Sequence, residues 1–167
     1  MAVEIERKFR LSSDHWRAAV ESSALLRQGY LANTPRCSVR VRLADRGAAA
    51  QGWLSVKAMT PGMRRSEYEA DVPAQDAREM LEQLCEGAVI EKWRHIVQYA
   101  GRKWEIDEFL GQNAGLIVAE IELESEQAEF RRPDWLGEEV THDVRYYNFQ
   151  LAQHPFCRWP AAAPAAQ

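Results

Sequence analysis

The chain begins with three charged side chains at every second position. In the segment 2–11, AVEIERKFRL, the side chains of Glu4, Glu6 and Lys8 alternate with those of Val3 and Ile5. Successive side chains of a β-strand point to opposite faces. As a strand, this segment therefore has one apolar face and one face that carries two acids and a base. Such a face is either solvated or part of a binding site.

The same alternation recurs in almost every later segment that is typical of a strand, and neighbouring charges on one face mostly share a sign. The acidic positions are Glu67, Glu69, Glu105, Asp107, Glu120 and Glu122. The basic positions are Arg40, Arg42, Lys57, Lys92 and Arg94. For any one strand, a solvated face is the more ordinary interpretation. For the whole set of strands a solvated face is a less convincing interpretation, because like charges two residues apart repel unless an ion of opposite sign is bound.

Two kinds of bound ion follow from these pairs. Paired carboxylates suit a hard divalent cation such as Mg²⁺ or Mn²⁺, and arginine pairs suit phosphate, which a guanidinium can bind through two hydrogen bonds. A metal–polyphosphate complex needs both. A non-catalytic binder of polyphosphate or nucleotide remains an alternative, but a polyanion by itself has no use for so many acids. A purely structural barrel leaves the acid pairs unexplained.

Composition restricts the class of protein further. The chain has 167 residues, of which 46% are hydrophobic and 28% charged, which is enough for the core of one folded domain. The net charge of -4 argues against a general nucleic-acid binder. Three widely spaced cysteines without a CxxC pattern favour a reducing compartment. We expect a cytoplasmic protein, because neither a signal-peptide pattern nor a long apolar run is present.

The periodicity of the apolar residues predicts the elements that must position these charges. Strands are predicted over 2–11, 26–32, 36–44, 51–59, 64–73, 89–100, 102–110 and 116–125. Helices are predicted over 15–26, 74–87 and 146–152, with a further short helix between 126 and 141. Turns or loops are predicted at 45–47, 60–62 and 100–101. Residues 1–155 then form a single domain, and 156–167 a disordered tail rich in Pro and Ala.

This order predicts an α+β fold in which the sheet dominates. Closing so many antiparallel strands into a barrel would remove the exposed edges of the sheet. The apolar faces would then pack outward against helices, and the charged faces would line a wet tunnel.

A series of motifs resembles one known family. The segment V-E-I-E-R-K-F resembles the ExExK signature of the CYTH family, the triphosphate tunnel metalloenzymes. The resemblance continues in order through S-V-R-V-R, L-S-V-K, R-S-E-Y-E, E-K-W-R, W-E-I-D-E-F, A-E-I-E-L-E and E-V-T-H-D-V-R-Y-Y-N, roughly from residue 2 to residue 153. It implies an eight-stranded antiparallel β-barrel, a tunnel of two similar halves with helices packed outside.

The resemblance also implies roles for the matching residues. Catalytic roles fall on Lys8, Glu4 and Glu6. Mg²⁺ or Mn²⁺ would be held by carboxylates among Glu4, Glu6, Glu67, Glu69, Glu105, Asp107, Glu120 and Glu122. The triphosphate would be bound by Lys8, Arg40, Arg42, Lys57, Arg65, Lys92, Arg94 and Arg145. The last of these arginines precedes a segment that, in relatives, becomes a short helix closing one end of the tunnel.

Members of the family differ in the triphosphate that they act on. The compact length and the E-I-E-R-K-F opening are most similar to the short bacterial triphosphatases, which favours hydrolysis of inorganic tripolyphosphate to pyrophosphate and phosphate. Hydrolysis of nucleoside or thiamine triphosphate, adenylate cyclisation and non-catalytic binding are the alternatives. The expected partner is a small-molecule triphosphate, without a membrane or nucleic acid. A monomer and a homodimer are both compatible with the sequence.

Overall fold

The computed structural model describes residues 2–46, 49–59 and 63–160. Its strands are β1 (Ala2–Leu11), β2 (Val20–Asn33), β3 (Cys37–Asp45), β4 (Ala50–Ala58), β5 (Arg64–Val72), β6 (Glu86–Tyr99), β7 (Arg102–Phe109), β8 (Ile117–Glu122) and β9 (Leu136–Glu139). Its α-helices are α1 (Ala74–Gln83) and α2 (Asn148–Gln153). Short 3₁₀ turns lie at His15–Ala19, Gly111–Asn113, Val144–Tyr146 and Phe156–Arg158. The predicted loop at 60–62 and the end of the predicted turn at 45–47 lie outside the described residues.

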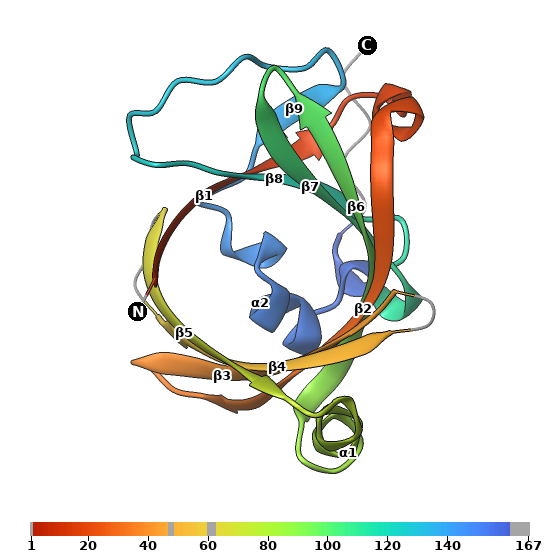
Figure 1. The fold of residues 1–167 in the computed structure, drawn as a ribbon, viewed down its shortest axis with the longest axis vertical. Coiled ribbons are helices and arrows are strands. Elements are labelled where there is room, and N and C mark those ends of the chain that lie inside the picture. Colours follow the sequence, from red (N-terminus) through yellow and green to blue (C-terminus); the bar gives the residue numbers. More distant parts are fainter. Residues whose placement is uncertain (1, 47–48, 60–62, 161–167) are drawn as a thin grey trace.

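The strands close into an antiparallel barrel (Figure 1). Their order is β5-β4-β3-β2-β6-β7-β8-β1, and a further pairing of β1 with β5 completes the ring of eight strands. The ninth strand, β9, pairs with the last residues of β1 on the edge opposite to β8, beyond the part of β1 that pairs with β5. Closure satisfies backbone groups that an open sheet would leave unpaired at its two edges. The closed eight-stranded barrel predicted from the sequence is thereby confirmed, with one extra strand.

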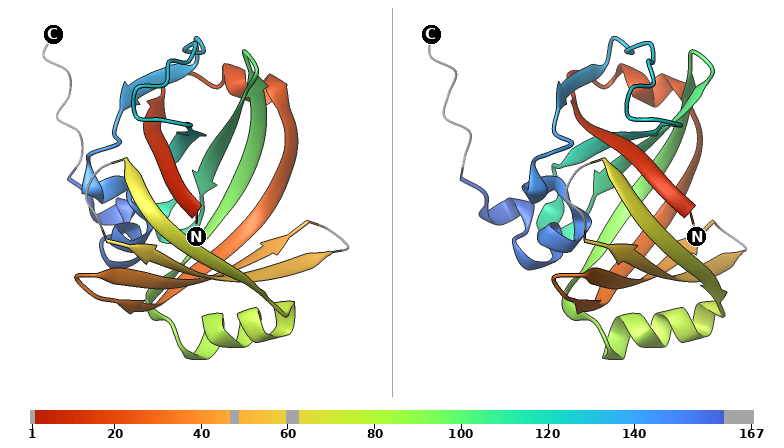
Figure 2. Two further views of the ribbon diagram at one scale, coloured as in Figure 1. Left: turned by 60° about the vertical axis from the view of Figure 1, so that its left-hand side comes forward. Right: turned by 90° about the vertical axis from the view of Figure 1, so that its left-hand side faces the viewer.

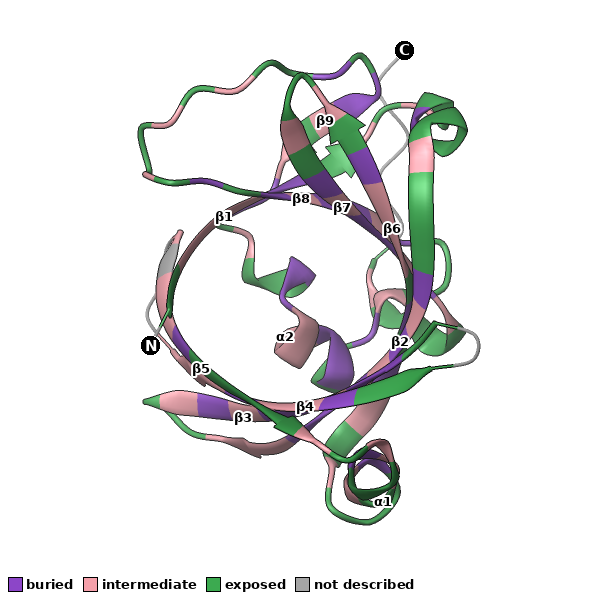
Figure 3. Ribbon diagram, in the orientation of Figure 1, coloured by how far each residue is buried: buried purple, intermediate pink, exposed green. Residues whose placement is uncertain are grey.

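The register of the strands places charged side chains of neighbouring strands next to each other on the same face of the sheet. On β1 and β8, Lys8 lies opposite Glu120 and Glu6 lies opposite Glu122. On β6 and β7, Arg94 lies opposite Asp107. Exposure varies from residue to residue along these strands (Figure 3). The alternation seen in the sequence therefore becomes a charged interior and an apolar exterior.

Helix α1 covers part of the apolar exterior (Figures 1 and 2). Its buried residues, Ala77 and Leu81, pack against Val41 and Leu43 of β3. The helix also lies close to β4 at Gly52, where an added Cβ would come within 2.8 Å of the Ala77 Cβ. A glycine is therefore required there for the helix to approach the sheet. The predicted helix over 74–87 is confirmed except for its last turn, because residues 86 and 87 already belong to β6.

A second apolar cluster lies on the outside of β1, β6, β7 and β8. Phe9 and Trp104 are fully buried there, covered by Trp16 from the turn after β1 and by Phe130 and Trp135 from the segment before β9. The rings of Phe9 and Trp104 meet edge to face with centroids 5.9 Å apart, a favourable aromatic geometry. Irregular chain rather than an α-helix covers this half of the barrel.

Two predicted helices are therefore wrong. Over 15–26 the chain forms only the 3₁₀ turn His15–Ala19, and β2 then begins at Val20. Residues 20–26 pair with β6, from Val20 opposite Val97 to Leu26 opposite Lys92. Between 126 and 141 the only regular element described is β9. In both places the pairing partner lies far along the chain, and the local composition alone favours a helix.

Helix α2, predicted over 146–152, closes one end of the barrel, as the resemblance implied for the segment after Arg145 (Figures 1 and 2). It packs against β6 and β2 through Leu151 and Ala152. The chain then continues into an ordered 3₁₀ turn, in which Phe156 and Trp159 join the same apolar cluster. Residues 156–159 were predicted to belong to a disordered tail, but they form this packed turn. Residues 161–167 lie outside the described residues. Among the described helices, none is long and apolar enough to cross a membrane.

Candidate active site

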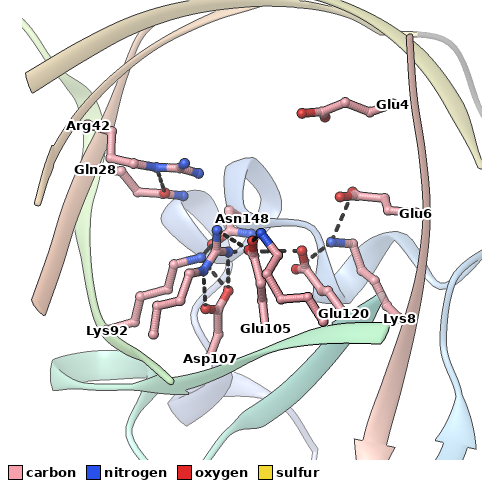
Figure 4. Close-up of polar contacts among 12 residues, drawn as sticks. Glu4, Glu6, Lys8, Gln28, Arg42, Lys92, Glu105, Asp107, Glu120 and Asn148 are labelled. Atoms are coloured by element: carbon pink, nitrogen blue, oxygen red, sulfur yellow. Dashed lines mark hydrogen bonds and ion pairs between the residues drawn. The ribbon is translucent and has the colours of Figure 1, made fainter. Parts of the chain in front are cut away.

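The interior of the barrel holds a cavity of about 210 Å³ whose wall is almost entirely charged. It is lined by Glu4, Glu6, Lys8, Arg40, Arg42, Lys57, Glu67, Glu69, Arg94, Lys103, Glu105, Glu120, Ile121, Glu122 and Asn148. Figure 4 shows such side chains converging on the interior from strands on different sides of the barrel. With one aliphatic residue among the fifteen, this wall suits ions and not an apolar molecule.

On one side of the cavity, lysines pair with glutamates of β1 and β8. The Nζ of Lys8 lies 2.7 Å from Glu120 Oε1 and 3.2 Å from Glu6 Oε1. The Nζ of Lys57 lies 2.6 Å from Glu4 Oε2. Burial by itself would raise the pKa of Glu6, but the positive charges of Lys8 and Lys57 outweigh it and hold that pKa well below its usual value. Burial opposes the charged form of Lys8 too, yet Glu120 and Glu6 raise its pKa. Glu6 and Lys8 are thus held in their charged forms and neutralise each other.

Two other acids of the wall lie close to further carboxylates, although Arg40 and Lys57 lie 3.3 and 3.7 Å from Oε1 of Glu67. Burial, a hydrogen bond to Glu4 and the charge of Glu4 raise the pKa of Glu67 to about 7. Burial and the charges of Glu4 and Glu105 raise the pKa of Glu122. Carboxylates that hinder each other's ionisation in this way bind a cation favourably, because the cation removes the repulsion.

The oxygen donors fit Mg²⁺ or Mn²⁺ in chemical type. Within the described part of the chain, however, no three acidic or imidazole side chains converge as a ready-made metal cluster. Lys57 stands at Glu4, and Lys8 stands between Glu6 and Glu120. Binding of a cation by these acids would release the lysines from their ion pairs. The freed ammonium groups could then bind an anion.

The opposite part of the wall is basic and incompletely satisfied. Arg42 has no carboxylate within ion-pair distance among the described residues, and its Nε donates to Gln28 Oε1 at 3.3 Å. Burial, together with the charges of Arg40 and Arg94, lowers the pKa of Arg42 to about 10. The buried Nε atoms of Arg40 and Arg65 have no acceptor in the described structure. A buried donor without an acceptor is costly, so these groups favour a bound anion rich in oxygen.

Two predicted site residues lie beneath the wall instead of on it. Lys92 and Asp107 are both completely buried, and their Nζ and Oδ2 atoms are 2.6 Å apart. Asp107 also accepts two hydrogen bonds from Arg94, at 2.7 and 2.8 Å. Although burial opposes ionisation, these two cations hold the pKa of Asp107 far below its usual value. Both acceptor oxygens of Asp107 are thus engaged with protein cations.

Two predicted phosphate-binding arginines, Arg65 and Arg145, do not line the main cavity. Arg65 lines a smaller pocket of about 40 Å³ next to α2, and its guanidinium carbon lies 4.4 Å from the centre of the Tyr147 ring. Arg145 lies outside both cavities, 57% exposed and paired with Asp143. The other predicted residues, apart from Lys92 and Asp107, line the main cavity.

Three lining residues are absent from the predicted site, namely Lys103, Asn148 and the aliphatic Ile121. Lys103 lies two residues before Glu105 on the same strand, so the two side chains share a face. This spacing could have identified Lys103 as a tunnel residue from the sequence. Asn148 is the first residue of α2, and no strand pattern points to it. Its place in the tunnel depends on the helix folding back into the end of the barrel.

The end of the tunnel away from α2 opens into a mouth with a different surface. This hollow, of about 530 Å³, shares Arg42, Glu69, Arg94, Lys103 and Glu105 with the main cavity. It also presents apolar side chains from the inner face of the barrel, namely Ala24, Leu26, Ala44, Trp53 and Ile96. The tunnel is therefore charged in its middle and partly apolar at its open end.

The fold and the site together define a class of protein: a closed antiparallel barrel whose tunnel of opposed acids and bases is built to bind ions. Residues 2–154 match the model of the CYTH domain family, so the chain belongs to that family. The family predicted from the sequence motifs is confirmed.

Curated relatives agree with this assignment. The chain is 47% identical over 156 residues to an inorganic triphosphatase of Acetivibrio thermocellus, covering 93% of this chain and 97% of that protein. It is 39% identical over 154 residues to an inorganic triphosphatase of Nitrosomonas europaea, covering 89% of this chain and 96% of that protein. The likeness extends over almost the whole length of both relatives.

Solved structures share the architecture. A crystal structure of an inorganic triphosphatase superposes with a TM-score of 0.63 at 35% identity, covering 91% of this chain and 95% of that one. A conserved hypothetical protein of Pyrococcus furiosus superposes with a TM-score of 0.57 at 17% identity, covering 74% of this chain and 80% of the other. The second likeness supports the fold alone.

Proposed function

We propose that this protein is a metal-dependent hydrolase that converts inorganic tripolyphosphate to pyrophosphate and phosphate. The observation that carries the proposal is the divided wall of the tunnel. Arg42 has no acidic partner among the described residues, and Arg40 has a buried donor without an acceptor, while the charge of Glu4 opposes the ionisation of both Glu67 and Glu122. A cation and a polyanion bound together would satisfy both sides. The two relatives named inorganic triphosphatase support this choice of substrate.

The residues of the tunnel divide the work of phosphoryl transfer to water. Arg40, Arg42 and Arg94 would bind and orient the phosphate chain, because guanidinium groups bind phosphate oxygens through paired hydrogen bonds. Lys8 and Lys57 would bind oxygens that gain charge as the phosphoanhydride bond breaks. Positioning and charge neutralisation supply most of the catalysis in such reactions.

The cation would be held by acids of β1 and β8, namely Glu4, Glu6, Glu120 and Glu122, with Glu67, Glu69 and Glu105 nearby on the wall. Mg²⁺ or Mn²⁺ bound there would neutralise phosphate charge and lower the pKa of an attacking water. We assign no metal role to Asp107, since its oxygens are occupied by Lys92 and Arg94. The described lining contains no Cys or His that could act as a covalent nucleophile.

A nucleoside triphosphate is the second candidate substrate, and the open mouth is the observation that favours it. Trp53 lies there beside Leu26 and Ala44, next to Arg42 of the charged wall. A planar base attached to a triphosphate could rest on these apolar groups while its phosphates enter the tunnel. Inorganic tripolyphosphate has no group that would use this surface.

A substrate panel tests both candidates. Phosphate release from tripolyphosphate, ATP, GTP and thiamine triphosphate is measured with Mg²⁺, with Mn²⁺ and with EDTA. We expect the highest kcat/KM for tripolyphosphate and no turnover in EDTA. Turnover of tripolyphosphate in EDTA would refute metal dependence, and a higher kcat/KM for ATP that W53A abolishes would favour the nucleotide.

Two further expectations accompany this function. A small-molecule triphosphatase needs neither a nucleic acid nor a membrane partner, and we propose a cytoplasmic location, which the three widely spaced cysteines of the chain favour.

A further inference from the structure

One side chain that lines the main cavity comes from helix α2 and not from a strand of the barrel. Because α2 closes one end of the barrel, we call it the plug helix and that end of the tunnel the plugged end. Among the described lining residues, Asn148 of α2 alone belongs to no strand. It borders the main cavity and also the small pocket next to α2, in which Lys8, Arg40 and Arg65 take part. Asn148 therefore lies where the plugged end of the tunnel meets the cationic wall.

The orientation of its amide is set by a buried lysine. Lys92 Nζ lies 3.0 Å from Asn148 Oδ1. The Nζ of Lys92 is the donor in this contact, and Oδ1 is the one acceptor atom of the amide, so the amide oxygen faces Lys92. The amide nitrogen Nδ2, at the opposite side of the same planar group, is then turned away from Lys92. No acceptor for Nδ2 is found in the described part of the structure.

Lys92 is itself held in place. It is completely buried, and Asp107 Oδ2 accepts from its Nζ at 2.6 Å. Asp107 is fixed in turn by hydrogen bonds from Arg94. Figure 4 shows Lys92, Asp107 and Asn148 gathered in one place. Lys92 has no surface with which to touch a substrate. What it can do is hold the amide of Asn148 in one orientation.

We infer that Asn148 is a substrate-binding residue whose Nδ2 donates a hydrogen bond to the terminal phosphate of a triphosphate chain at the plugged end of the tunnel, with Lys92 and Asp107 as its positioning residues. This inference rests on the proposed function, because it assigns a contact to the same substrate. It also gives Lys92 an indirect role in place of direct contact with phosphate. The plug helix then takes part in binding instead of only closing the barrel.

The test is the isosteric variant N148D. A carboxylate at this position still accepts from Lys92, so the plug stays attached and the Tm of the protein without ligand is expected to be unchanged or higher. The donor toward the substrate becomes an anionic acceptor. We expect KM for tripolyphosphate to rise about 10-fold or more, with a smaller change in kcat. The affinity for the non-hydrolysed imidotriphosphate analogue, measured calorimetrically with Mg²⁺, is expected to fall by a similar factor.

The matched control is Q153E, the same amide-to-carboxylate change on the exposed side of α2, which is expected to alter neither KM nor analogue affinity. Should N148D lower the Tm, the neutral variant N148S is expected to show the same loss of affinity. The positioning role is tested by K92M, which is expected to raise KM in the wild-type background but to add little in N148S.

Unchanged KM and analogue affinity in N148D and N148S would overturn the inference alone, provided that the wild-type protein binds tripolyphosphate. A wild-type protein that binds none would overturn the proposed function and this inference with it. Equal losses in Q153E would show that charge anywhere on α2 is responsible, and would also overturn the inference.

Discussion

Replacement of Glu67 by glutamine is expected to stabilise the metal-free protein at alkaline pH. Glu67 is buried beside Glu4, and this environment raises its pKa from the ordinary 4.5 to about 7. For an acid whose pKa is raised by folding, the native state favours the protonated form. Its stabilising contribution is fully present below pH 4.5 and is lost as the pH rises through 7. Glutamine keeps the shape of the protonated acid and cannot ionise, so it avoids that loss.

The size of the effect follows from the pKa. A factor of ten in a proton equilibrium is worth ~1.4 kcal/mol, so the rise from 4.5 to about 7 corresponds to an upper limit of roughly 3.4 kcal/mol. The tunnel admits solvent to this carboxylate, and screening reduces the figure to about 1–2 kcal/mol. For a chain of 167 residues this is a rise of about 3–6 °C in Tm.

Calorimetric melting of the wild type and E67Q at pH 5 and pH 8.5, in EDTA, measures this effect. We expect equal Tm values at pH 5 and the higher Tm for E67Q at pH 8.5. With saturating Mg²⁺ the order should reverse, because a bound cation favours the carboxylate and not the amide. The control E82Q, on the exposed side of α1, should show no difference at either pH. A Tm gain of the same size at both pH values would refute the reasoning, since it could not come from ionisation of Glu67.

Three further predictions concern the same tunnel. E6Q removes a proposed metal ligand while keeping its shape, and kcat/KM for tripolyphosphate should fall at least ~100-fold at normal Mg²⁺; full activity would show that the acids of β1 hold no cation. R42A removes a cation that no described carboxylate neutralises, so KM should rise about 10- to 100-fold without loss of Tm in the free protein, and an unchanged KM would place the phosphate chain elsewhere. Mg²⁺ and imidotriphosphate together should raise the Tm by more than the sum of their separate effects, because each ion neutralises the site of the other; merely additive increases in a melting titration would contradict the shared tunnel.

The sequence by itself determined which side chains share a face of each strand. The alternation of Glu4, Glu6 and Lys8, and the later pairs of like charge, fixed which side chains share a face, because that relation depends only on neighbouring residues. Helix α1 was likewise predictable from its spacing of apolar residues. The hairpin between β6 and β7 was also predicted, and its turn residues Ala100 and Gly101 adopt the positive φ values that such a turn needs.

Tertiary structure decided which local preference prevailed and how deep each charge lies. Residues 20–26 carry a helical composition but pair with β6, because closing the barrel requires β2 to span the gap between β3 and β6. The alternation of side chains placed Lys92 and Asp107 on the charged face. It could not reveal that α2 folds over them, or that they form a buried ion pair that does not reach the cavity. Asn148 enters the site for the same reason: its position depends on contacts between segments far apart in the chain, and a local sequence pattern carries no record of those contacts.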